Sequence, residues 1–433
     1  MSFISETYNR NLAFESSTIS RNIEENRKGN FTLCITLDGK SLDNAEISYD
    51  LVRHDFDFGC NIFMLDQHDS ADDENTYREL WQKLFNTAVV PLYWEGTEPQ
   101  RGKLRYSSDV ANDVYRRPPV DTVVDFCKKS GISMKGHPLF WHEFVPKWLP
   151  ESWDELLPLI EKRFCEISER YSADIPVFDL VNEPARIWDI IYEEKLSPHR
   201  KWILPPENYL DIVFELGKKY FPNNTLILNE AVSGSFCDFR GIYSGYYQLI
   251  EKCLEKEYKL DSIGLQCHVF DSPQFRNIFD AERLYGVLDI YGSLGKPLVL
   301  SEIGLSAEND EIQAMAAEML YKVCFSHKSM GGIFWWNLDD NGVLCTKDRN
   351  AVGENLPSSG LIRNGVPKAA YKAISKLIKN EWVSNGTTKI ENGRCDIDCF
   401  FGTYDAEISA NGFCKKVQLK LLQCADRTVE IDL

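Results

Sequence analysis

The sequence is poor in the features that mark several large classes of protein. No run of about 18 apolar residues occurs, so the sequence does not predict a membrane-spanning helix. No cluster of lysine and arginine occurs either, and the formal net charge of −18 at pH 7 would repel nucleic acid and anionic lipid. We therefore expect neither nucleic acid nor a membrane as a partner, and a neutral ligand fits the charge better.

Motifs for common cofactors and nucleophiles are also missing. The sequence has no glycine-rich phosphate loop of the P-loop or dinucleotide type and no G-x-S-x-G motif. The 13 cysteines are an odd number without a C-x-x-C pair, a pattern that favours free thiols in a reducing compartment. His137 and His142 are not part of an H-E-x-x-H helix. We predict no cofactor and no metal.

The first residues, MSFISETYNR, have neither the basic start nor the apolar centre of an export signal. Together with the cysteines, this predicts a cytoplasmic protein, or a secreted one if a leader precedes this sequence in nature. The sequence does not predict an oligomeric state.

Eight short apolar runs alternate with amphipathic helical stretches from Phe56 onward. Two of these stretches, residues 207–221 and 314–327, carry apolar residues at helical spacing. Such alternation is typical of βα units with a parallel sheet, and eight units predict an α/β fold, a (β/α)8 TIM barrel over residues 56–379. The eight runs begin near Phe56, Phe85, Ile132, Val177, Leu226, Ser262, Leu298 and Gly332.

The two ends of the chain have a different pattern. Residues 1–55 predict a helix followed by a small β extension, in which Asp38-Gly39 joins two β-rich runs as a hairpin. Residues 380–433 contain short strands separated by Asn-Gly turns and predict a small C-terminal β module. Whether these terminal segments pair with each other is left open, and the role of the module is structural support unless exposed aromatic residues bind sugar.

Polar and aromatic residues follow the predicted barrel strands, and the carboxyl ends of barrel strands form the active-site face. Glu183 and Glu302 follow the fourth and seventh runs, on opposite walls. A single glutamate there could equally be a solvated charge, but two at these strands favour chemistry. Retaining hydrolysis of a glycoside needs two carboxyl groups about 5–5.5 Å apart. The residues expected to face one pocket are Asn182, Glu183, Asn229, Gln266, His268, Glu302, Trp335 and Trp336.

We predict roles for four of these residues. Glu183 would be the general acid/base, because a second carboxylate nearby keeps it protonated, and Glu302 would be the nucleophile. His268 would donate a hydrogen bond to Glu302, and Asn182 would hold the sugar 2-OH. Each of four tryptophans could either stack on a sugar ring or fill the core. They are Trp94, Trp141, Trp335 and Trp336.

Six ordered motifs resemble glycoside hydrolase family 10, whose members are mainly endo-β-1,4-xylanases. They are EPQRGKLRY, KGHPLFWH, FDLVNEP, IGLQCH, LVLSEIG and FWWNLDD, and they extend over roughly residues 56–378. The resemblance implies a (β/α)8 barrel and a retaining mechanism, with Glu183 as acid/base and Glu302 as nucleophile. It also implies sugar contacts at His137, Trp141, Asn182, Gln266, His268 and Trp335.

The sequence departs from this family where the second strand ends. A Glu-Asn pair and a lysine that usually bind sugar are replaced by Val89, Val90 and Tyr93. A second tryptophan beyond the eighth strand is absent from the segment DDNGVLCTKD. Losing several hydrogen bonds of ~0.5–1.5 kcal/mol each would change sugar selectivity. An apolar wall here could accept an aglycone or a different sugar.

The sequence thus predicts a retaining β-glycoside hydrolase of the endo-β-1,4-xylanase type that acts on xylan-derived oligosaccharides. Two alternatives remain open at this point. The chain could hydrolyse another β-linked plant glycoside on the same scaffold, or it could be a carbohydrate-binding protein that has lost turnover. The sequence does not decide between exo and endo cleavage.

Overall fold

The computed structural model describes residues 3–107, 109, 114–185, 203–270, 272–340, 358–410 and 412–433. Eight parallel strands close into a barrel, in the order β10-β11-β4-β5-β6-β7-β8-β9. Each strand corresponds to one of the eight predicted apolar runs, which confirms the predicted (β/α)8 barrel. The strands are β4 (Asp57–Asn61), β5 (Thr87–Pro91), β6 (Ser133–His137), β7 (Val177–Asn182), β8 (Thr225–Glu230), β9 (Ser262–Phe270), β10 (Leu298–Ser306) and β11 (Met330–Trp335).

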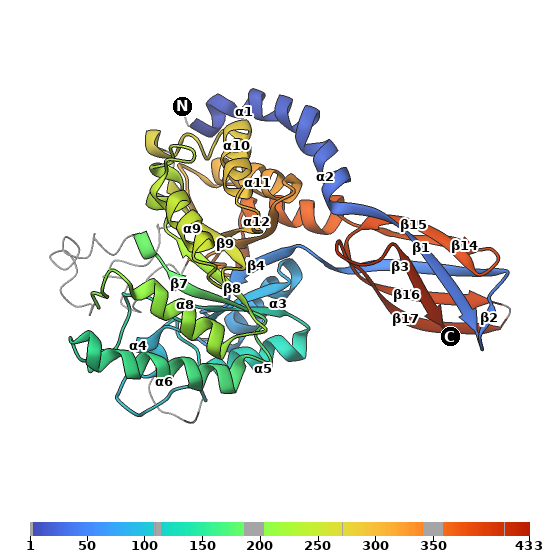
Figure 1. The fold of residues 1–433 in the computed structure, drawn as a ribbon. Helices are drawn as coiled ribbons and strands as arrows, with labels where there is room; N and C mark the ends of the chain where they lie inside the picture. Colours follow the sequence, from blue (N-terminus) through green and yellow to red (C-terminus); the bar gives the residue numbers. More distant parts are fainter. Residues whose placement is uncertain are drawn as a thin grey trace.

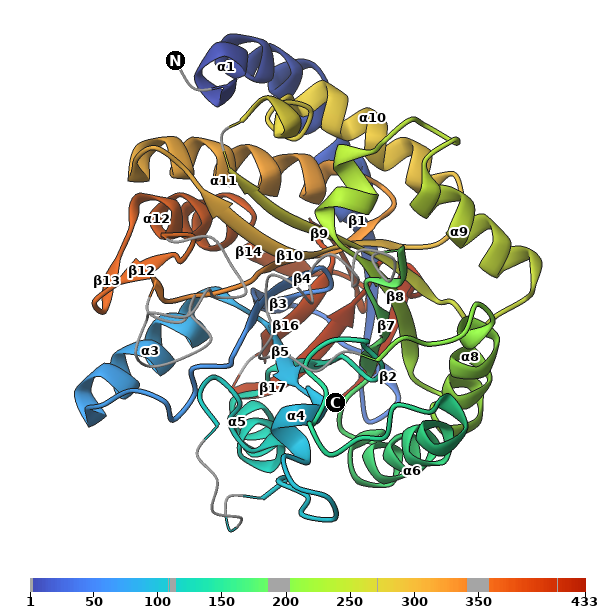
Figure 2. The ribbon, with the colours of Figure 1, turned by 90° about the vertical axis from the view of Figure 1, so that its left-hand side faces the viewer.

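Helices surround the barrel strands, as Figure 2 shows along the barrel axis. The outer ring consists of α3 (Ala71–Leu84), α5 (Val120–Ser130), α6 (Trp153–Tyr171), α8 (Tyr209–Tyr220), α9 (Gly245–Glu255), α10 (Ala281–Gly292), α11 (Asp310–Ser326) and α12 (Ala369–Lys376). Three of them begin with a side-chain cap, because Ser70, Asp280 and Asn309 each accept a backbone N–H three residues ahead. In the described part of the chain, no helix has the length and apolar character needed to cross a bilayer.

The barrel strands are buried on both faces, as expected of a parallel sheet covered by helices. Every residue of β5 is buried, and β6 to β11 are buried over most of their length. Their outward side chains form one continuous apolar core with the helices. Polar side chains that point into the barrel are therefore held away from bulk water.

The N-terminal helices pack on the outside of the barrel. α1 (Phe3–Phe14) continues through one π-helical turn into α2 (Ser20–Arg27), and these helices contact α10 and α11. Ile4 and Ile23 are buried in the barrel's core, and Thr7 Oγ1 donates to the carbonyl of Phe279 at 2.7 Å. The helical part of the N-terminal segment thus belongs to the barrel's helix layer.

The strands of both terminal segments form two sheets that face each other. The first has the order β15-β1-β18 with β2 beside β1, and the second has the order β14-β3-β16-β17. One apolar core lies between them, and Figure 1 shows this β module projecting from one end of the barrel. The strands are β1 (Lys28–Leu37), β2 (Lys40–Ser41), β3 (Ala45–His54), β14 (Asn385–Ile390), β15 (Arg394–Phe400), β16 (Gly402–Ala410), β17 (Phe413–Leu421) and β18 (Thr428–Asp432).

The predicted hairpin at Asp38-Gly39 is present, but with a different second strand. Asp38 and Gly39 have φ of 50° and 71° and turn β1 back onto the two-residue strand β2. The second β-rich run, β3, pairs with β14 and β16 in the other sheet. Each long run has one apolar face, and these faces meet across the module instead of edge to edge. The domain boundaries after residues 55 and 379 stay a prediction.

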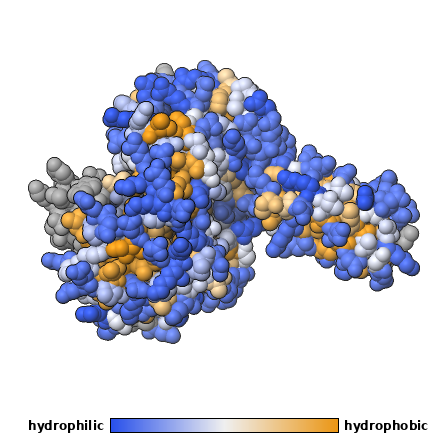
Figure 3. Space-filling model, in the orientation of Figure 1, coloured by the Kyte–Doolittle hydropathy of each residue, from blue (hydrophilic) through white to orange (hydrophobic). Residues whose placement is uncertain are grey.

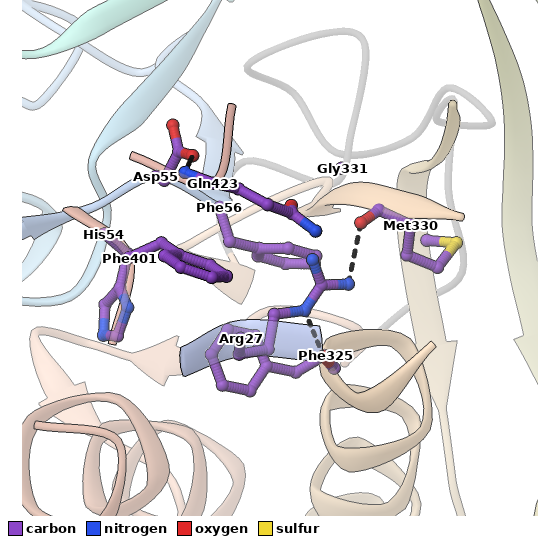
Figure 4. A pocket seen from close by; sticks show the side chains of 9 residues that line it. All are labelled: Arg27, His54, Asp55, Phe56, Phe325, Met330, Gly331, Phe401 and Gln423. Atoms are coloured by element: carbon purple, nitrogen blue, oxygen red, sulfur yellow. Dashed lines mark hydrogen bonds between the residues drawn. The ribbon is translucent and has the colours of Figure 1, made fainter. Parts of the chain in front are cut away.

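Arg27 joins the module to the barrel (Figure 4). Its guanidinium group is buried and donates to the carbonyls of Phe325, His327 (2.6 Å) and Met330 (2.8 Å). Its Cζ lies 4.7 Å from the centre of the Phe56 ring. Burial lowers the pKa of Arg27 to about 10, so the group remains charged at neutral pH. Phe56 and Met330 lie at the starts of β4 and β11, so the module joins the barrel at the end where the strands begin.

Replacing Arg27 by methionine should lower the free energy of unfolding by about 3 kcal/mol, because three buried carbonyl groups lose a charged donor. Urea unfolding measures this change. Arg21→Met is the matched control in the same helix, since Arg21 is 63% exposed and should contribute less than about 0.5 kcal/mol. Equal stability of the two variants would show that Arg27 does not stabilise the contact between the β module and the barrel.

Candidate active site

Glu183 and Glu302 are both buried at the carboxyl ends of barrel strands. Glu183 directly follows β7 and is 6% exposed, whereas Glu302 lies within β10 and is 3% exposed. Glu183 has a left-handed backbone with φ of 54°, which costs about 1 kcal/mol for a residue with a side chain. Its backbone N–H donates to the carbonyl of Asn229 at 2.7 Å, which holds it in this conformation.

Polar side chains from three other strands surround the Glu302 carboxyl group. Asn229 Nδ2 donates to Oε1 at 2.8 Å, and His268 Nε2 lies 3.1 Å from Oε2. His137 Nε2 lies 3.9 Å from Oε1. The predicted contact between His268 and Glu302 is therefore present. Donors of this kind stabilise an ionised carboxylate, the form that a nucleophile needs.

A network of side-chain amides connects the two glutamates. Asn229 Nδ2, which binds Glu302, also donates to Asn182 Oδ1 at 2.8 Å. Gln266 Nε2 lies 3.2 Å from Asn182 Oδ1 and 3.2 Å from Glu183 Oε1. Because its oxygen accepts from both neighbours, Asn182 offers its amide N–H groups as donors to a bound sugar. The structure thus brings the predicted residues Asn182, Glu183, Gln266, His268 and Glu302 together.

Two small residues fix the orientation of Asn229. Ser301 Oγ donates to Asn229 Oδ1 at 2.5 Å, which leaves the amide nitrogen to face Glu302. Gly264 on the adjacent strand β9 makes room, since a Cβ atom there would lie 2.4 Å from the same oxygen. A larger residue at position 264 would push the amide away from the carboxylate.

A buried ion pair that sequence reasoning missed lies beneath the site. Asp179 Oδ2 accepts from Lys135 Nζ at 2.5 Å and lies 2.7 Å from His137 Nδ1. Burial alone would raise the pKa of the Asp179 carboxyl group, but the Lys135 ammonium group and His137 together lower it. Asp179 orients the His137 ring, whose other nitrogen faces Glu302. The sequence pattern that could have revealed this ion pair is a charged residue within each of two otherwise apolar strands, Lys135 in β6 and Asp179 in β7.

Trp336, and not Trp335, lies beside the candidate catalytic residues. The Trp336 ring centre is 5.2 Å from that of His137 and 6.2 Å from that of His268. Trp335 is fully buried among the residues between barrel and helices, and its Nε1 donates to the Ser359 carbonyl at 2.9 Å. The expectation that both tryptophans face one pocket was wrong, because consecutive residues of a strand point to opposite faces. The sugar contact inferred for Trp335 therefore does not fit its position.

The other two tryptophans also differ in position. Trp141 is half-buried, stacks on Phe144 at 5.0 Å between ring centres and lies 6.5 Å from the His137 ring, so it borders the site. Trp94 belongs to the core, where it packs against Trp148, and its Nε1 donates to Glu98 at 3.1 Å.

The segment that departs from the family pattern contributes an apolar wall. Val89 and Tyr93 pack with Phe63, Phe144, Phe334 and Trp336 in a cluster that we call the apolar wall. Val90 points the other way, into the main core. The Arg117 guanidinium group covers Tyr93, with its Cζ 3.7 Å from the ring centre. Residues 341–348, where a second tryptophan was expected and is absent from the sequence, lie outside the described residues.

One group of side chains in the described ranges could hold a metal ion. The ligand atoms of His142, Glu143 and Glu183 all lie within 4.8 Å of one another. The prediction that the protein uses no metal is not tested by this geometry and stays a prediction.

Comparison with known proteins identifies the family. The model of glycosyl hydrolase family 10 matches residues 50–377, and the chain belongs to this family. The chain is similar to endo-1,4-beta-xylanase 1 of Arabidopsis thaliana, with 24% identity over 86% of this chain and 35% of that protein. It is also similar to the anti-sigma-I factor RsgI6 of Acetivibrio thermocellus, with 23% identity over 90% of this chain and 46% of that protein.

The chain therefore spans less than half the length of these relatives. Among solved structures, xylanase 10B of Thermotoga petrophila in complex with xylobiose matches with a TM-score of 0.57 and 19% identity. That match covers 84% of this chain and 98% of the other, and it supports the barrel fold.

Replacing Asp179 by asparagine should lower the free energy of unfolding by about 3 kcal/mol at neutral pH, because Lys135 is left buried without its counter-charge. Since the pKa of Asp179 is lowered in the folded state, its contribution is full above about pH 4 and is lost as the pH falls further. Chemical unfolding at several pH values measures both effects. Asp174→Asn, which removes a surface pair with Lys128, is the control and should cost less than about 1 kcal/mol. A loss for Asp179→Asn that persists undiminished at the lowest pH would contradict the assignment.

Proposed function

We propose that the protein is a retaining β-glycoside hydrolase of the endo-β-1,4-xylanase type. The observation that carries the proposal is the pair of buried glutamates at the ends of β7 and β10, connected through the amides of Asn182, Asn229 and Gln266. Membership of glycosyl hydrolase family 10 and the names of its relatives support the same activity.

In the proposed mechanism, the Glu302 carboxylate attacks the anomeric carbon while Glu183 gives its proton to the leaving oxygen. The glycosidic bond breaks and the sugar is attached to Glu302. Glu183, now a carboxylate, takes a proton from water, and the hydroxide displaces Glu302 with a second inversion. Asn229 and His268 stabilise Glu302 when it is ionised, before and after the reaction. The released sugar keeps the β configuration.

We propose xylan-derived oligosaccharides as the substrates. A solved structure with the same fold is described as a complex with xylobiose, and the amide nitrogen of Asn182, whose oxygen accepts from Asn229 and Gln266, provides donors for sugar hydroxyl groups. His137, Trp141 and Trp336 would form the sides of the sugar site, with Trp336 in the place expected for Trp335.

The apolar wall favours a second candidate on the same scaffold, a hydrolase of another β-linked plant glycoside. Val89 and Tyr93 themselves offer no charged group to a sugar bound against them. Such a surface suits a sugar or an aglycone with fewer hydroxyl groups. The third alternative is sugar binding without turnover. The presence of both glutamates argues against it.

Glu302→Gln should lower kcat on the true substrate by about 10⁴-fold or more, because the amide cannot attack the anomeric carbon. Reducing-sugar release and the anomeric configuration of the first product, followed by NMR, measure the effect. Glu308→Gln is the matched control, since Glu308 is exposed six residues further along the chain and should be fully active. Wild-type turnover in the Glu302→Gln protein, or an α-configured first product from the wild type, would sink the proposal.

A panel of xylo-, gluco- and arabino-configured oligosaccharides and aryl glycosides separates the candidates. We expect the wild-type protein to release reducing sugar from xylo-oligosaccharides, and product lengths will then distinguish exo from endo cleavage. Cleavage of another glycoside alone would favour the second candidate. Binding by calorimetry without any cleavage would favour the non-catalytic one.

A further inference from the structure

A buried arginine on the outer helix α6 reaches the two loops that carry Tyr93 and Trp141. Arg163 is 4% exposed, and its guanidinium group donates to the carbonyl oxygens of Leu92 and of Leu139, the latter at 3.4 Å. Leu92 directly follows β5, and Leu139 lies two residues after the end of β6. One side chain therefore binds the backbones of two neighbouring loops.

The backbone N–H groups of the same two leucines are bound from the other side. Leu92 donates to the His137 carbonyl at 2.7 Å, and Leu139 donates to the Asp179 carbonyl at 2.9 Å. Each leucine is thus tied to the next barrel strand by its N–H and to Arg163 by its carbonyl. Because buried carbonyl groups need a donor, both loops would lose one of these two attachments without the arginine.

A threonine extends the contact to the residue after Leu92. Arg163 Nη1 donates to Thr97 Oγ1 at 2.8 Å, and Thr97 Oγ1 donates to the Tyr93 carbonyl at 3.1 Å. The Arg163 Cζ also lies 5.3 Å from the centre of the Trp94 ring. The arginine therefore fixes two successive carbonyl groups, one directly and one through the hydroxyl group.

The side chains on these loops border the sugar site next to the proposed nucleophile. The Tyr93 ring centre lies 5.5 Å from that of His137 and 5.8 Å from that of Trp141. His137 Nε2 lies 3.9 Å from Glu302 Oε1. In the proposed mechanism, the sugar that becomes attached to Glu302 would therefore lie beside Trp141, with Tyr93 packed against the tryptophan ring.

The guanidinium group makes these contacts as a cation. Burial lowers the pKa of Arg163 to about 10, and the charges of Glu98 and Glu166 offset part of that effect, so the group is charged at neutral pH. A charged donor binds a carbonyl group more strongly than a neutral one does. An apolar side chain of similar size would avoid the cost of burying a charge. What the charge contributes here is the connection between the two loops.

We propose that Arg163 is a positioning residue that holds Trp141 at the sugar site by connecting the loops after β5 and β6. This inference rests on the proposed function, in which the sugar attached to Glu302 lies beside Trp141. Arg163 itself touches neither the substrate nor the reacting atoms. Without it the sugar would bind less tightly, whereas Glu183 and Glu302, which the amide network connects, would stay in place.

The variant Arg163→Met tests the proposal, because methionine fills much of the same space without a donor. The substrate is the nitrophenyl glycoside of the sugar that the panel identifies. We expect KM to rise about tenfold and kcat to change by less than about threefold, since binding is weakened before the chemical step. Arg170→Met is the matched control on the same helix. Arg170 is 47% exposed, and its replacement should leave both constants unchanged.

A double-mutant cycle separates positioning from a general loss of structure. Trp141→Ala alone should raise KM by a factor similar to that of Arg163→Met. If the arginine acts through the tryptophan, adding Arg163→Met to Trp141→Ala should raise KM by less than about twofold more. Arg163→Lys keeps a charged donor and should recover part of the affinity. If Arg163→Met does not fold, as its thermal midpoint will show, Arg163→Lys is used in the same cycle.

The outcomes distinguish this inference from the proposed function. If the wild type cleaves no glycoside, the proposed function is wrong, and the cycle is then measured from the calorimetric affinity for xylotriose. If the wild type also binds no xylotriose, the inference is wrong as well. If the wild type is active but the effects of the two variants on KM multiply, or Arg163→Met lowers kcat and leaves KM unchanged, only the role of Arg163 is wrong.

Discussion

Inside the barrel, one carboxylate is shared between an ammonium group and an imidazole ring. Asp179 lies between Lys135 and His137 without access to water, so its charge must be balanced by these two neighbours. His137 can face Glu302 with its second nitrogen only because Asp179 holds the first. The geometry around Glu302 therefore depends on an ion pair that would contact no substrate.

Side chains from several strands fix the rest of the site in a similar way. Neutral amides from three strands link the two glutamates, and a serine and a glycine fix the amide that touches Glu302. Neutral donors can support one charged and one protonated carboxyl group without adding a competing charge. The apolar wall, which includes Val89 and Tyr93, contributes no group to this network. Under the proposed function, a different wall would change the preferred sugar without changing the reaction.

Sequence alone predicted the barrel, because eight apolar runs at regular spacing allow few other folds. It also predicted that Glu183 and Glu302 belong to one site, since the carboxyl ends of barrel strands share one face. It expected both Trp335 and Trp336 at the site, whereas only Trp336 lies there, because which of two neighbouring residues faces the site depends on strand register to within one residue. Nor did it predict the Lys135–Asp179 pair or the closeness of Glu143 to Glu183. Because these contacts join residues of different strands and loops, no pattern within a single stretch of sequence predicts them.

The interleaving of β1 and β3 with strands from the other end of the chain has a consequence for synthesis. In the β module, β1 lies between β15 and β18, and β3 lies between β14 and β16. The barrel is synthesised between these two sets of strands, so the edges of β1 and β3 stay unpaired until β14 to β18 have been made. Once β14 to β18 dock, the segments on either side of the barrel are held in the same two sheets. Neither β1 and β3 nor the strands that follow the barrel can then be pulled away without breaking a sheet that also holds the other set.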